Sequence, residues 1–94
     1  MNEAEFELAT LLALPRDQYK GRKAFLAAAL DAAREQKYHV VERRDPDTRK
    51  ILAIEVWHGA RRLDMREPTS EMEIPGVTLV ALIAAIRRYR GLPP

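Results

Sequence analysis

Residues 38–66 read YHVVERRDPDTRKILAIEVWHGARRLDMR, and the pattern in this stretch decides the fold of the chain. Two groups of turn-forming residues divide it into three segments in which apolar and polar residues alternate. In the first group, residues 45–48, aspartate side chains bond nearby backbone amides and Pro46 presets φ for the turn. In the second group, Gly59 and Ala60, the glycine supplies the positive φ that a hairpin favours. The stretch therefore predicts a three-stranded antiparallel meander over 37–66.

The two turns also predict a register for the strands. A turn at residues 59 and 60 pairs Val56 with Leu63, and a turn centred on residues 46 and 47 pairs Val41 with Leu52. Because successive side chains of a strand point to opposite faces, these pairs assign every strand residue to a face. The predicted core face comprises Val41, Leu52, Ile54, Val56, Leu63 and Met65. The predicted outer face, half apolar and half charged, comprises Tyr38, Val40, Glu42, Ile51, Ala53, Glu55, Trp57, Arg62, Asp64 and Arg66.

Apolar residues at helical spacing predict two helices before the meander. The first covers 2–14, where Asn2 and Glu5 form a capping-box pattern and Pro15 ends the helix. The second covers 17–36, with Asp17 as its N-cap.

A third helix is expected after the meander, separated from it by an acidic loop over 67–75. This helix covers 76–90, and Gly91 is its predicted C-cap. Its apolar surface is so broad that the helix is expected to be buried on more than one side. The expected fold class is α+β: a single domain over 1–94, in the order α-α-β-β-β-α, with the meander packed on helices.

The composition is that of an ordinary soluble globular domain, with 47% hydrophobic residues, 32% charged residues and a formal net charge of +2. The abundance of arginine and alanine is typical of a GC-rich bacterial or phage genome. The first residues carry acids where a signal peptide needs positive charge. The longest apolar run, 77–86, is shorter than the roughly 20 residues that span a bilayer. We therefore expect a cytoplasmic protein with no membrane contact.

No motif in the chain indicates catalysis or a cofactor. The chain has no cysteine, and its two histidines, His39 and His58, fall on different strands with no carboxylate at ligand spacing. No serine or threonine is flanked by a histidine or a glycine-rich elbow, and no glycine-rich phosphate loop exists. The sequence predicts a protein that is not an enzyme and that holds no metal and no cofactor.

The order helix-strand-strand-strand-helix over 23–90 resembles the topology of double-stranded-RNA-binding domains. Such domains begin their last helix with lysines that meet phosphates, whereas here Glu71 and Glu73 precede that helix. The first strand connection also carries acids, Asp45 and Asp47. The resemblance is one of topology and does not by itself imply RNA binding.

The outer sheet face is the surface on which the sequence places a function. Tyrosine, tryptophan and arginine dominate the energetics of protein interfaces. The expected function is therefore a small protein–protein interaction module: a homo-oligomer, an adaptor or an inhibitor of a larger complex. Its expected partner-binding residues are Tyr38, Val40, Ile51, Trp57 and Arg62. The competing interpretation is that the N-terminal helix covers this face and makes Trp57 part of the core.

The alternative function is nucleic-acid binding. Basic residues gather around the first strand connection, where phosphates would contact Arg43, Arg44, Arg49 and Lys50. The low net charge argues against this alternative, because phosphate binding usually needs a marked basic face.

Overall fold

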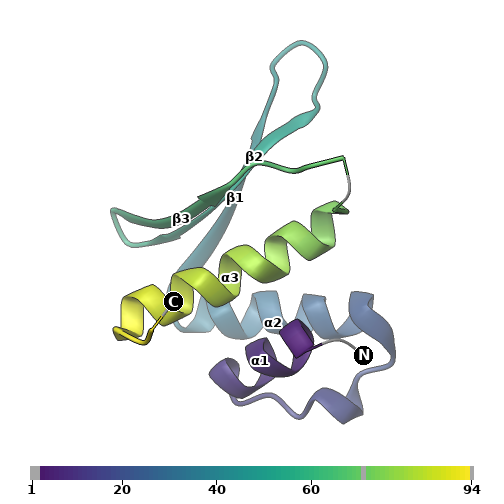
Figure 1. The fold of residues 1–94 in the computed structure, drawn as a ribbon, viewed down its shortest axis with the longest axis vertical. Coiled ribbons are helices and arrows are strands. Elements are labelled where there is room, and N and C mark those ends of the chain that lie inside the picture. The colour runs from purple at the N-terminus through teal and green to yellow at the C-terminus, as the bar shows by residue number, and fades with distance from the viewer. Residues whose placement is uncertain (1–2, 71, 94) are drawn as a thin grey trace.

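The computed structural model describes residues 3–70 and 72–93. Its elements are α1 (Glu3–Leu12), the 3₁₀ turn η1 (Arg16–Gln18), α2 (Gly21–Glu35), β1 (Tyr38–Arg44), β2 (Ile51–His58), β3 (Arg61–Arg66) and α3 (Ile74–Arg90). The strands form one antiparallel sheet in the order β1-β2-β3. The predicted fold class is confirmed (Figure 1).

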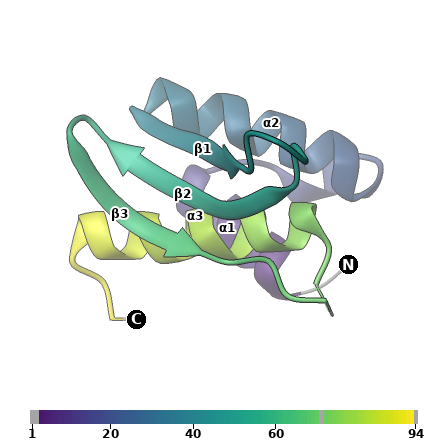
Figure 2. The same cartoon turned by 90° about the horizontal axis from the view of Figure 1, so that it is seen from above.

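All the helices lie on one side of the sheet. Helices α2 and α3 pack directly on it, and α1 packs against α2 and α3 (Figures 1 and 2). The centre of the core lies between these layers, and Phe25, Ile54, Leu63, Leu82 and Ile86 are fully buried there. In the part of the chain that the structure describes, no helix has both the length and the apolarity needed to cross a bilayer.

The first strand connection has the turn chemistry that its sequence predicts. Asp45 Oδ1 accepts hydrogen bonds from the backbone N–H groups of Asp47 at 2.8 Å and Thr48 at 3.0 Å. The backbone of Asp45 also bonds to Lys50 and Arg49. These bonds close the β1–β2 hairpin, whose tip projects beyond the helices (Figure 1).

The ends of α1 and α2 differ from the predicted ones. Helix α1 ends at Leu12, before Pro15, because Ala13 takes a positive φ of 56° and the Leu14 N–H bonds back to the Ala9 carbonyl at 2.8 Å. The predicted cap Asn2 lies outside the described residues. Asp17 does not cap α2, which was a wrong prediction: Asp17 belongs to η1, and α2 begins at Gly21.

Helix α3 begins at Ile74, two residues before the predicted start, with Pro75 in its first turn. Its C-terminal end is as predicted. Gly91 has a φ of 71°, and the Leu92 N–H bonds to the Arg87 carbonyl at 2.8 Å, which completes a Schellman motif.

A β-bulge changes the pairing of β2 with β3. The predicted pair of Trp57 with Arg62 is present, but the register then shifts and Val56 opposes Asp64 instead of Leu63. The extra residue, Leu63, is fully buried, and Asp64 beside it is also buried. Asp64 and Arg66 therefore share the helix-facing side with Val56 and Ile54, and their predicted place on the outer face was wrong.

The predicted register of β1 with β2 was also wrong. Val41 opposes Glu55 rather than Leu52, and Val40 opposes the fully buried Val56. A second irregularity leaves Leu52 without a partner and half exposed, whereas Ile51 is packed against the core. The observed pairing of β1 with β2 differs from the predicted one by an odd number of residues. Such a shift moves each side chain of β1 to the opposite face of the sheet.

Candidate functional site

The sheet has one face that no described helix covers, which we call the open face. Its members are cross-strand neighbours in the observed register: His39, Val41, Arg43, Ala53, Glu55, Trp57, Arg62 and Met65. In Figure 2 the strands lie in front of α3 and α1, and no described helix lies over them. The interpretation that the N-terminal helix covers this face was wrong, because α1 packs on α2 and α3 instead.

The centre of the open face is a carboxylate. Glu55 is only 4% exposed, although it lies on an uncovered face, because neighbouring side chains close over it. Its Oε1 accepts hydrogen bonds from Trp57 Nε1 and from Arg43 Nε, both at 2.9 Å. Its Oε2 accepts a hydrogen bond from Arg62 Nη1 at 3.3 Å. One residue from β2 therefore orients side chains from all three strands.

These hydrogen bonds favour the ionised form of Glu55. The bond from Trp57 lowers the pKa of Glu55 most; burial opposes it, and the bonds and charges of Arg43 and Arg62 lower the pKa further. The net effect is a pKa below the ordinary value for glutamate. The carboxylate of Glu55 is therefore an acceptor shared by three side chains of the open face.

The groups that a partner would meet are arginines and apolar side chains. Arg43 and Arg62 are 57% and 49% exposed, whereas the carboxylate between them is covered. Trp57 is partly exposed, and Met65 is exposed beside Arg62, whose Nη1 lies 3.7 Å from the Met65 sulfur. The open face thus presents positive charge around an aromatic ring.

Two of the five predicted partner-binding residues are on this face, and three are not. Trp57 and Arg62 are in the predicted pair. Tyr38 is 3% exposed and belongs to the core, Val40 packs against the core from the same side, and Ile51 is turned toward the core by the irregularity in β2. The predicted placement of these three residues on the outer face was wrong, because it followed from the register predicted for β1 and β2.

The ring of Tyr38 lies instead in an aromatic cluster on the helix-facing side of the sheet. It packs edge-on against His58 at 5.3 Å and against Tyr89 at 5.7 Å, and His58 stacks on Tyr89 at 4.0 Å between ring centroids. This cluster joins β1 and β2 to the end of α3. The ring of His58 is therefore packed between two tyrosine rings.

The basic residues of the first connection are divided by the structure. Arg43 is a member of the open face and bonds to Glu55. Arg44 donates hydrogen bonds to the Glu42 carboxylate and to the Arg49 carbonyl. The side chain of Arg44 therefore joins β1 to the connection between β1 and β2. Arg49, at a φ of 64°, and Lys50 are exposed near the hairpin tip. Of the four residues predicted to bind nucleic acid, Arg43 is therefore the one that lies beside Trp57 and Arg62, which were predicted to bind a protein partner.

Sequence reasoning missed four members of the open face: His39, Val41, Arg43 and Met65. One signal for the β1 residues was available. Tyr38 and Val40 lie on the face of β1 opposite to Val41, and both residue types are common on buried strand faces, so the opposite assignment of β1 was also consistent with the pattern.

Among residues 3–70 and 72–93, no group of three or more histidine and carboxylate side chains is placed to hold a metal ion. Comparison of the chain with protein-family models, with curated proteins and with solved structures found no match.

Proposed function

We propose that this protein is a protein–protein interaction module, an adaptor or an inhibitor of a larger complex, that binds through the open face. The observation that carries the proposal is the one-sided fold: the helices leave the opposite sheet face uncovered, and Trp57 lies on that face beside Glu55. A tryptophan held by a hydrogen bond offers a large contact area and loses little conformational freedom on binding, as interface anchors do.

The charges of the open face indicate the chemistry of the partner. Arg43 and Arg62 are exposed, and the carboxylate of Glu55 is already occupied by them. A second copy docked face to face would bring these arginines together, which costs free energy. We therefore expect a different protein, with carboxylates around an apolar patch, to bind more tightly than a second copy.

Site-specific cross-linking in cells tests the proposal. A photo-cross-linking residue in place of His39 lies exposed on the open face beside Trp57, its cross-strand neighbour. The same residue in place of Phe6, which is half exposed on α1, is the matched control. We expect a discrete protein adduct from position 39 that disappears with Trp57→Ala and is absent from position 6.

The Trp57→Ala variant should remain folded. The side chain is only partly buried, so its removal should cost well below the roughly 3–5 kcal/mol that loss of a buried aromatic costs. Light scattering over a concentration series then distinguishes self-association from binding of a different protein. A molar mass that doubles with concentration in the unmodified protein but not in Trp57→Ala identifies self-association. No adduct from position 39, together with a constant monomer mass, contradicts the proposal.

Nucleic-acid binding is the second candidate, because Arg43, one of the hairpin cations, and Trp57 donate to the same carboxylate, Glu55, on the open face. Single-stranded nucleic acids bind where bases stack on aromatic rings and arginines track the phosphates. In this case a single-stranded oligonucleotide binds the purified protein at low salt. Changing Arg43 and Arg49 together to alanine then weakens that binding and flattens its salt dependence. No binding at low salt eliminates this candidate.

A further inference from the structure

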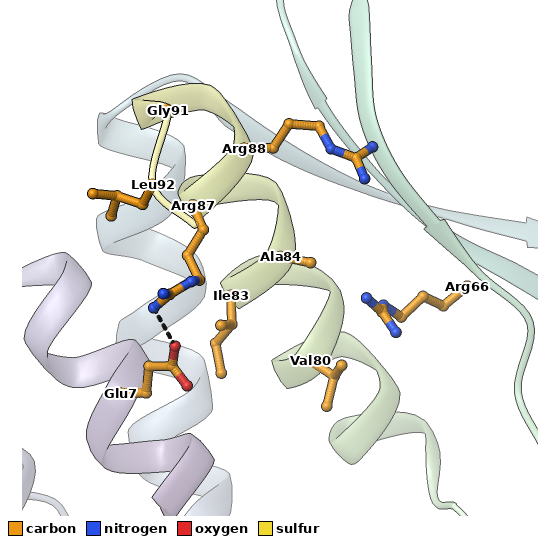
Figure 3. Close-up of a pocket in the computed structure, with 9 residues that line it drawn as sticks. All are labelled: Glu7, Arg66, Val80, Ile83, Ala84, Arg87, Arg88, Gly91 and Leu92. Atoms are coloured by element: carbon orange, nitrogen blue, oxygen red, sulfur yellow. Dashed lines mark hydrogen bonds and ion pairs between the residues drawn. The ribbon is translucent and has the colours of Figure 1, made fainter. Parts of the chain in front are cut away.

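A groove runs along α3 on the helical side of the sheet, away from the open face. It has a volume of about 700 Å³ and is lined by Glu7, Arg66, Val80, Ile83, Ala84, Arg87, Arg88, Gly91 and Leu92. Figure 3 shows Arg66 extending toward α3 and Arg88 extending from α3 toward the strands. Val80 and Ala84 lie on the helix beside Arg66, two turns and one turn before Arg88, and form an apolar floor (Figure 3).

The arginines of this groove have unequal partners. Arg87 donates to Glu7 at 2.6 Å, and Arg66 donates to Asp64 at 2.9 Å. Arg88 is exposed and donates through Nη1 to the neutral Leu63 carbonyl at 2.6 Å. Within 3–70 and 72–93, no carboxylate pairs with Arg88. The groove therefore has an apolar floor and an unneutralised guanidinium at its side.

The groove continues past Arg66. A second hollow of about 330 Å³ shares Arg66 and Val80 with the first and adds Met65, Glu67, Thr69, Met72 and Val77. A rise of 1.5 Å per residue makes the helix between Val77 and Arg88 about 16 Å long. That length corresponds to roughly five residues of extended chain. The strand beside the groove, β3, is an edge strand: among the described strands, β2 is its only neighbour in the sheet.

We propose that this groove binds an extended segment of a partner protein that carries an apolar side chain next to a carboxylate. The apolar side chain lies on Val80 and Ala84, and the carboxylate bonds to the free N–H groups of Arg88, with Arg66 adding positive charge. An extended segment matches the length of the groove and runs beside an edge strand, which is a common way for domains to bind peptides. The groove lies on the other side of the sheet from Trp57, and its second hollow shares Met65 with the open face.

The groove is tested with a displayed library of random heptapeptides panned against the intact protein. We expect the enriched peptides to combine aspartate or glutamate with an apolar residue. The affinity of the best peptide, made with a fluorescent label, is then measured by anisotropy. Arg88→Gln should weaken it about tenfold or more, because a charge-assisted hydrogen bond is lost. Arg88→Lys, which keeps the charge without the fork geometry, should give an intermediate loss.

Two further variants locate the binding. Ala84→Glu places a carboxylate on the groove floor and should weaken binding at least as much as Arg88→Gln. Arg90→Gln changes an exposed arginine of the same helix, which bonds to the Gln36 side chain, and should leave the affinity unchanged. Trp57→Ala should also leave it unchanged, which separates this site from the open face. Circular dichroism confirms that each variant is folded.

Several results overturn the proposal. Absence of any enriched peptide does so, as do binders that are indifferent to Arg88→Gln and Ala84→Glu. Binders that are lost with Trp57→Ala belong to the open face instead. A single-stranded oligonucleotide that binds in an Arg88-dependent way, where peptides do not, would assign the groove to phosphates.

Discussion

At the scale of single residues, Glu55 shows how one carboxylate organises an otherwise uncovered surface. The side chains of Arg43, Trp57 and Arg62 come from three strands, and each donates to it. Long arginine side chains on a sheet surface normally sample many rotamers, and ordering them costs conformational entropy. A shared acceptor orders them in the free protein, so less of that cost would fall on the proposed binding.

The indole N–H of Trp57 is the strongest contributor to the lowered pKa of Glu55. Trp57→Phe keeps an aromatic ring and removes this donor, so we expect the pKa of Glu55 to rise toward its ordinary value. An NMR titration that follows the Glu55 carboxyl carbon measures the change. The control is Tyr89→Phe, which alters an exposed aromatic residue on α3 and should leave that pKa unchanged. An unaltered Glu55 titration in Trp57→Phe would show that the arginines alone set it.

At the scale of elements, α3 is the centre of stability because it contacts the sheet, α1 and α2. Val77, Leu79, Leu82, Ala85 and Ile86 are buried along its length. Its C-terminal arginines serve packing as well as the helix dipole: Arg88 reaches the Leu63 carbonyl, and Arg87 reaches Glu7 of α1. The helix therefore connects every other layer of the molecule.

Leu82 has no exposed surface, so Leu82→Ala should lower the free energy of unfolding by roughly 2–5 kcal/mol. Ile83 also lines the groove, so its truncation should cost less than that of Leu82. Arg88→Ala should cost still less, because it removes an exposed side chain with a single carbonyl bond. Urea denaturation of the three variants gives the ranking. Equal small losses would mean that α3 is peripheral.

At the scale of the whole molecule, α1 is attached to the other layers by a buried ion pair. Glu5 and Arg16 are both buried and bonded to each other, and Arg22 also donates to Glu5. The Arg16 guanidinium lies 4.7 Å from the centre of the Phe25 ring. Burial raises the pKa of Glu5, but the hydrogen bonds and charges of Arg16 and Arg22 outweigh burial and lower it.

The lowered pKa of Glu5 predicts that acid loosens the fold. A group whose pKa is lower in the folded state binds fewer protons there than in the unfolded chain. Its contribution to stability is complete above the unfolded pKa of about 4.3 and is lost as the pH falls through the folded value. Urea titrations between neutral and acidic pH measure this loss.

Glu5→Gln should lower the free energy of unfolding near neutral pH by roughly 3–5 kcal/mol, because Arg16 loses its charged partner. The variant should also depend less on pH than the unmodified protein. The matched control is Glu3→Gln on the exposed side of the same helix, which should change neither quantity appreciably. A pH dependence equal in all three proteins would assign acid sensitivity to other carboxylates.

The amino-acid sequence by itself determined the element order and the fold class, because these depend on local chemistry. The Asp45 side chain bonds to the amides two and three residues ahead of it, so the first turn forms wherever the chain places it. Gly91 ends α3 for the same kind of reason, since its positive φ costs a glycine little. The pairing of Trp57 with Arg62 was predicted correctly because it lies close to the second turn, before the bulge shifts the register.

Only the tertiary structure decided which residues share the open face. The bulge at Leu63 places both Leu63 and Asp64 in buried positions, and the irregularity at Leu52 turns Ile51 toward the core. In β1, the assignment of Tyr38 to the core depends on contacts with Tyr89, which is far away in the sequence. Strand alternation allows two opposite assignments of faces, and distant packing partners choose between them. For that reason the sequence identified the Trp57–Arg62 pair of the candidate surface but not its full set of side chains.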